Sequence, residues 1–197
     1  MSLRPEISGF SLDAMFGPIG TKDEDVLARI LQALDDSVRS RDPGLIERAR
    51  DVLRRAIFEE VPWPDLEVEG EAHVMAAIVL ARYGQTHLST GSNVWKMPAF
   101  WSFIKGYHTR LEGDARKALF VFGRGRAIFG RRIETPWSYY GFLSLPQVQT
   151  LHAGLAKMRD DDPGLCGDGF MGGFLDELIG WLAAVESSHQ DLWFHCD

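Results

Sequence analysis

Residues 139–148 read YYGFLSLPQV and predict a strand that passes directly into a helix. Aromatic and apolar residues from Tyr139 to Leu143 are typical of a strand. Ser144 is a favoured N-cap, Pro146 suits the first helical turn, and Gln147 completes a capping box with Ser144. The helix that follows has a predicted buried stripe at helical spacing, formed by Val148, Leu151, Leu155 and Met158.

Both ends of the chain add elements to this strand and helix. Apolar spacing predicts a last helix over about 174–185, and LWFHC at residues 192–196 predicts a closing strand. At the other end, ISGF at residues 7–10 predicts a further strand. Together with the helices expected between them, these elements predict an α+β fold, a mostly helical single domain over residues 1–197 with a small sheet that includes the N- and C-terminal strands.

The strand at 7–10, the stretch YGFLSLPQV and the terminal helix–strand pair resemble the YfbM-like group of small bacterial proteins of unknown function. The resemblance covers the two ends of the chain, and Gln147 stands where the group often has an acid. It implies the α+β fold class and a bacterial intracellular setting. Because the group has no assigned activity, the resemblance carries over no catalytic residue.

The middle of the chain predicts more helices. A capping box of Thr21 and Glu24 predicts the start of an amphipathic helix, and two further helices are expected over about 43–57 and 71–83. We expect a polar loop over 85–93 and a helix after Pro98, up to about residue 110. The apolar run 117–122 fits a strand as well as a helix end, and we interpret it as strand or irregular.

Composition and charge narrow the classes of protein. The chain has 197 residues, is 45% hydrophobic and carries a net charge of −7, so it has an ample core and no overall attraction to nucleic acid or an anionic membrane. Apolar runs are too short for a membrane span, and the N-terminus lacks a signal-peptide pattern. Cys166 and Cys196 are expected to be reduced thiols, although the sequence does not show whether they are close in space. These features predict a cytoplasmic protein.

Motifs for cofactors and metals are incomplete. Gly167, Gly169 and Gly172 match a dinucleotide-binding pattern, but no strand precedes them. The acidic run 160–162 lacks the spacing of a calcium loop, and His195 and Cys196 lack further ligands at zinc-site spacing. We therefore expect no cofactor and no metal.

Positive charge is concentrated in one part of the chain. Residues 105–132 hold eight Lys and Arg and only two acids, with aromatic residues interleaved, whereas residues 59–71 hold six acids and no base. The basic segment has three interpretations, namely pairing within the chain, an acidic protein partner, or nucleic acid, which the net charge disfavours. The candidate binding residues are Trp95, Trp101, Tyr107, Arg124, Arg126, Arg131, Arg132 and Trp137.

Two hypotheses for the function follow from this segment. The first is a non-enzymatic intracellular interaction protein, an immunity-like or regulatory binder, that uses the aromatic and arginine-rich surface. The alternative is a small enzyme that acts on an anionic substrate, with arginines as the anion site and His87 or His108 as the acid/base. Neither hypothesis fixes the oligomeric state.

Overall fold

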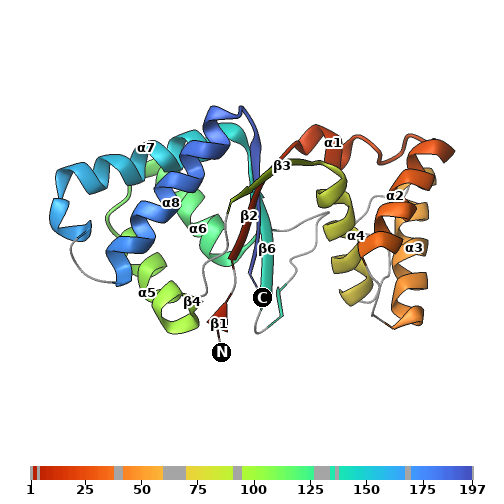
Figure 1. Cartoon of the computed structure of the whole chain (residues 1–197), viewed down its shortest axis with the longest axis horizontal. Helices are drawn as coiled ribbons and strands as arrows, with labels where there is room; N and C mark the ends of the chain where they lie inside the picture. The colour runs from red at the N-terminus through yellow and green to blue at the C-terminus, as the bar shows by residue number, and fades with distance from the viewer. Residues whose placement is uncertain are drawn as a thin grey trace. The chain divides into compact units, whose positions relative to one another are not determined.

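The computed structural model describes residues 2–3, 5–37, 42–59, 70–90, 95–126, 134–135, 138–166 and 170–196. Its fold is α+β and mostly helical, as predicted (Figure 1). The chain divides into two compact units. Unit 1 is Met1–Gly9, His87–Arg126 and Glu134–Asp197, and unit 2 is Phe10–Thr86 and Ala127–Ile133. The single domain of residues 1–197 remains a prediction.

A five-stranded sheet includes strands from near both ends of the chain, which confirms the expected sheet. Its strand order is β3-β2-β7-β6-β5. The strands are β2 (Pro5–Phe10), β3 (Gln85–Thr90), β5 (Glu134–Thr135), β6 (Ser138–Leu143) and β7 (Asp191–Cys196). β6 pairs antiparallel with β7 and places Gly141 opposite Phe194. A Cβ on Gly141 would lie 2.5 Å from Cζ of Phe194, so glycine makes room for the aromatic ring. A second, two-stranded sheet pairs β1 (Ser2–Leu3) with β4 (Trp95–Lys96).

The helices of unit 1 lie on one side of this sheet (Figure 1). They are α5 (Met97–His108), α6 (Gly113–Arg124), α7 (Leu145–Asp161) and α8 (Phe170–Ser187), with a short 3-10 helix, η2 (Pro163–Cys166), between the last two. Apolar side chains from all four α-helices and from the strands form one buried cluster. Trp181 of α8 and Trp193 of β7 are buried, which confirms the expectation that both belong to the core.

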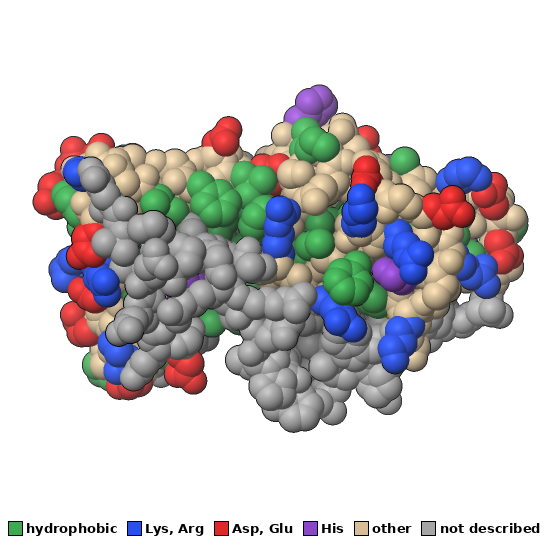
Figure 2. Space-filling model, turned by 180° about the vertical axis from the view of Figure 1, so that it is seen from behind, with side chains coloured by type: hydrophobic (Ala, Val, Ile, Leu, Met, Phe, Trp, Pro, Cys, Tyr) green, Lys and Arg blue, Asp and Glu red, His purple; other side chains and the backbone are tan. Residues whose placement is uncertain are grey.

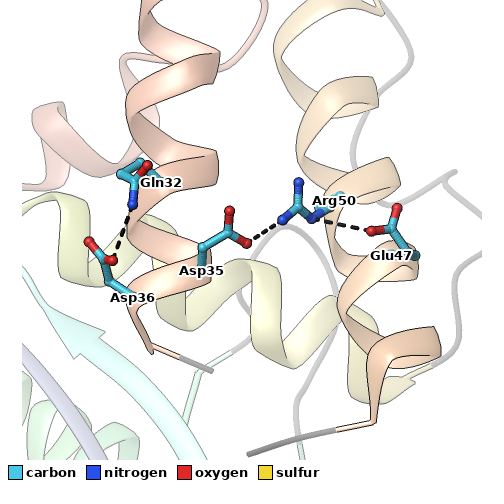
Figure 3. A network of polar contacts seen from close by, with 5 residues as sticks. All are labelled: Gln32, Asp35, Asp36, Glu47 and Arg50. Carbon is cyan, nitrogen blue, oxygen red and sulfur yellow. Dashed lines mark hydrogen bonds and ion pairs between the residues drawn. The ribbon is translucent and has the colours of Figure 1, made fainter. Parts of the chain in front are cut away.

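Unit 2 is built from helices that pack on α4 (Gly70–Tyr83). These are α1 (Leu12–Phe16), α2 (Glu24–Ser37) and α3 (Pro43–Phe58). α4 is apolar on most of its surface, and eight of its residues are buried, His73 among them. At the surface Arg50 of α3 bonds to Asp35 of α2 and lies 3.5 Å from Glu47, while Gln32 donates to Asp36 (Figure 3).

Three local predictions are wrong. Residues 85–90 form strand β3, where we expected a loop. Residues 117–122 belong to helix α6, where we expected a strand or irregular chain. The cap of α2 is Asp23, whose Oδ1 accepts the backbone N–H groups of Asp25 and Val26 at 2.9 and 3.1 Å, whereas the Thr21 hydroxyl donates to the carbonyl of Pro18.

Candidate functional site

Helix α6 sorts its side chains into a buried and an exposed face. It begins after Glu112 and carries Asp114 in its first turn, which suits the positive end of the helix dipole. Its buried residues are Ala115, Ala118, Leu119, Phe122 and Gly123. This spacing directs Phe120 outward, and its side chain is 40% exposed. Among the described residues, Phe120 is the exposed large hydrophobic side chain.

Two cationic or titratable side chains contact the Phe120 ring. The ring of His108, at the end of α5, lies 5.7 Å from it between centroids, at an interplanar angle of 47°. Arg124, one turn further along α6, places its Cζ 4.9 Å from the ring centroid. Such a cation–π contact at an exposed site contributes on the order of 0.5–1 kcal/mol. The ring is therefore held by two neighbours while its remaining surface faces solvent.

Further basic side chains lie on the same two helices, within about one turn of His108 or Phe120. We define the α5–α6 face as Lys105, His108, Arg116, Lys117, Phe120 and Arg124. Lys117 donates to Asp114 at 2.7 Å, and this carboxylate raises the pKa of the Lys117 amine while the amine lowers the pKa of Asp114. Within the described part of the chain, no carboxylate pairs with the side chains of Lys105, Arg116 or Arg124. Figure 2 shows, on its right side, Lys and Arg side chains and a histidine gathered around hydrophobic atoms.

The pairing of charges in unit 2 gives a contrast. There the guanidinium of Arg50 is engaged by Asp35 and Glu47, so its charge is largely neutralised by the protein itself (Figure 3). On the α5–α6 face, Arg116 and Arg124 are exposed and lack such carboxylates among the described residues. Their positive charge is therefore available to an external anion.

Arg126 has a different environment from Arg124. Its side chain is half-buried, its Cζ lies 4.4 Å from the centroid of the Phe142 ring, and Nη1 donates to Oε1 of Gln147 at 3.1 Å. These contacts join the end of α6 to β6 and to the first turn of α7. Arg126 therefore belongs to the structure of unit 1 more than to the α5–α6 face.

The other candidate residues fall into three groups. Tyr107 is 4% exposed and packs edge-on against Phe103 at 4.5 Å between centroids, so it lies in the core and not on a binding surface. Its position on α5 faces inward because the helix repeats at 3.6 residues and Phe103 lies one turn before it. Trp95 lies in β4 and Trp101 in α5, and their side chains are outside the described atoms, as is that of His87 in β3. Three candidates lie outside the described residues, namely Arg131, Arg132 and Trp137.

A groove of about 600 Å³ lies between the start of α6 and the second half of α7. Its lining combines apolar side chains with charged ones, four of which pair with one another. Arg110 donates to Asp162 at 2.9 Å, and Lys157 donates to Asp161. The described residues that line it include no histidine. An acid/base site for an anionic substrate therefore gains no support from this groove.

Sequence reasoning missed Phe120 as the centre of the site. The signal was present, since Leu111, Ala115, Ala118 and Phe122 repeat at three and four residues and place position 120 on the opposite face. The interpretation of 117–122 as a strand concealed this pattern, because a strand would place Phe120 and Phe122 on the same side.

The chain was compared with protein-family models, with curated proteins and with solved structures, and no match was found in any of the three. The resemblance to the YfbM-like group therefore remains a prediction. Within the described part of the chain, none of the helices is long and apolar enough to cross a membrane.

Proposed function

We propose that this protein is a non-enzymatic interaction protein that binds an acidic protein partner through the α5–α6 face. The proposal depends on one observation. The Phe120 ring is exposed and contacts His108 and Arg124 on a face whose arginines, Arg116 and Arg124, are also exposed. Aromatic residues and arginine are the residue types enriched where binding energy is concentrated at interfaces, and Phe120 with Arg124 combines the two.

Charge favours a protein partner over nucleic acid. The chain carries a net charge of −7, which repels a polyanion at long range. At the start of α6, the N-cap residue Glu112 and Asp114 lie within about one turn of Arg116, so a phosphate backbone bound along this helix would meet their carboxylates. A protein segment can place its carboxylates only where Arg116 and Arg124 lie and leave the acidic end of the helix uncontacted.

A capture experiment with a charge-reversed variant tests the proposal. The wild-type protein, Arg116→Glu/Arg124→Glu and the control Arg54→Glu are immobilised and exposed to a nuclease-treated bacterial lysate. Arg54 is an exposed arginine of α3 in unit 2. Its reversal therefore changes the charge of an exposed arginine, as the test variant does, but outside the α5–α6 face. We expect acidic proteins to bind the wild type and the control and to be lost from the doubly reversed variant.

The purified partner then provides a quantitative measurement. Its affinity, measured by calorimetry, should fall as salt rises from 50 to roughly 300 mM, because exposed charges are screened over about 10 Å or less. Equal capture by the wild type and the doubly reversed variant, with unchanged melting temperatures, would contradict the proposal. Capture from an untreated lysate that is absent from the nuclease-treated one would indicate nucleic acid instead.

A further inference from the structure

The exposed residues of α6 lie along a line. Arg116, Phe120 and Arg124 are separated by four residues each, so they project from the same face of the helix. Each step of four residues rises about 6 Å along the axis, so the Cα atom of Phe120 lies midway between the Cα atoms of Arg116 and Arg124. All three side chains are exposed.

This line has a definite order of chemistry, namely positive, apolar, positive. Lys117 lies next to it but is engaged by Asp114, so the two arginines carry the charge of the line. The contacts of Phe120 with His108 and Arg124 restrict the ring before any partner arrives, which lowers the entropy lost on binding.

We infer that the partner contributes an acidic amphipathic helix with the complementary order, in which an apolar side chain lies four residues from a carboxylate on each side. The apolar side chain packs on Phe120, and the carboxylates pair with Arg116 and Arg124. A helix fits because its own four-residue repeat matches that of α6 over both steps. This inference rests on the proposed function and names the kind of segment that the α5–α6 face recognises.

Synthetic peptides of 18 residues test the inference by fluorescence anisotropy. The first contains the order Glu, three residues, Leu, three residues, Glu, on an alanine- and glutamine-rich helix. The second replaces the leucine with serine, and the third has the same composition in a scrambled order. An oligodeoxythymidine serves as the nucleic-acid probe. Each is titrated with the wild type, Phe120→Ser, Arg116→Glu/Arg124→Glu and the control Arg54→Glu.

We expect the first peptide to bind the wild type and the control alike. Replacing leucine in the peptide, or Phe120 in the protein, should weaken binding by at least about tenfold, as for a central anchor of an interface. The doubly reversed variant should lose binding. Phe120 is exposed, so Phe120→Ser should fold, and a thermal melt confirms this for each variant.

Two results would overturn the inference and leave the proposed function intact. One is equal affinity for the ordered and the scrambled peptide, since only net charge would then matter. The other is no binding of the ordered peptide at 1 mM (roughly −4 kcal/mol) while a lysate partner still depends on Arg116 and Arg124. Tighter binding of the oligonucleotide than of the peptide would overturn both.

Discussion

The guanidinium group of Arg126 lies over the ring of Phe142, with its Cζ 4.4 Å from the ring centroid. The same side chain donates to Oε1 of Gln147, and the backbone N–H of Arg126 donates to the carbonyl of Tyr140 at 3.1 Å. Arg124, only two residues earlier, is exposed and contacts Phe120. Neighbouring arginines of one basic segment therefore have different roles, one in the stability of unit 1 and one at its surface.

Substitution of each arginine should separate these roles. Arg126→Ala removes a cation–π contact and a hydrogen bond, so we expect the free energy of unfolding to fall by about 1–2 kcal/mol. Arg124→Ala removes one exposed contact and should change it by less than about 0.5 kcal/mol. Urea denaturation measures both. A larger loss for Arg124→Ala than for Arg126→Ala would show that the structural role has been assigned to the wrong residue.

The strand–helix unit around Ser144 could be predicted because its signals are local. Gln147 Oε1 accepts the backbone N–H of Ser144 at 3.0 Å, and α7 buries Val148, Leu151, Leu155 and Met158 as expected. Strand β3 gave no such signal. Its residues are QTHLST, a polar run, and it is a strand because it lies beside β2 in the sheet, a non-local pairing that no short window contains.

The candidate site could be predicted only in part for a related reason. A basic, aromatic segment is visible in the sequence, but the face on which each side chain lies depends on the type of element. In α6 the helical repeat buries Phe122 and exposes Phe120, and in α5 it buries Tyr107. Whether the guanidinium group of an arginine already contacts another part of the chain also depends on residues far away in the sequence, as the contact of Arg126 with Phe142 shows.

The cap of α2 provides a test of which of two nearby residues starts the helix. Asp23→Ala leaves the N–H groups of Asp25 and Val26 without their acceptor, so we expect a loss of about 0.5–2 kcal/mol in the free energy of unfolding. Thr21→Ala removes only the hydroxyl bonded to Pro18 and should cost less. Chemical denaturation of the two variants distinguishes them. The reverse order of losses would restore the capping box of Thr21 and Glu24.

The ion pair of Asp114 and Lys117 predicts a defined response to pH. Lys117 lowers the pKa of Asp114 from its ordinary 3.8, mainly through the hydrogen bond, so the pair's contribution is present above that value and is lost as pH falls through the lower pKa of the folded state. The pKa of Lys117 is raised from 10.5, so the contribution is lost again only above that value.

An NMR titration of the Asp114 carboxyl carbon measures this shift. Lys117→Met should return the pKa of Asp114 toward 3.8, whereas Lys157→Met, which removes an amine paired with Asp161 in α7, should leave it unchanged. An Asp114 pKa that does not change in Lys117→Met would contradict the pair. Both amines are exposed, so folding should survive in each variant.

Substitution by alanine at two glycines inside helices, Gly154 and Gly180, should change the free energy of unfolding in opposite directions. A Cβ on Gly154 of α7 would lie 2.7 Å from Cβ of Ala115 in α6, and neither atom can rotate away. Gly180 of α8 is exposed, and a Cβ there would meet nothing within 4 Å. Alanine is favoured over glycine in a helix by up to about 1 kcal/mol, so Gly180→Ala should stabilise the protein.

At Gly154 the gain in helix propensity is smaller than the cost of overpacking. A Cβ there would force α6 and α7 apart, and overpacking costs about 1–3 kcal/mol. Gly154→Ala should therefore lower the free energy of unfolding, as measured by urea denaturation. Ala115→Gly, which on its own costs about 1 kcal/mol of helix propensity, should cost less or even stabilise in the Gly154→Ala protein, because it restores the space between the helices. If the effects of the two substitutions simply add, the helices do not approach each other as closely as these two residues require.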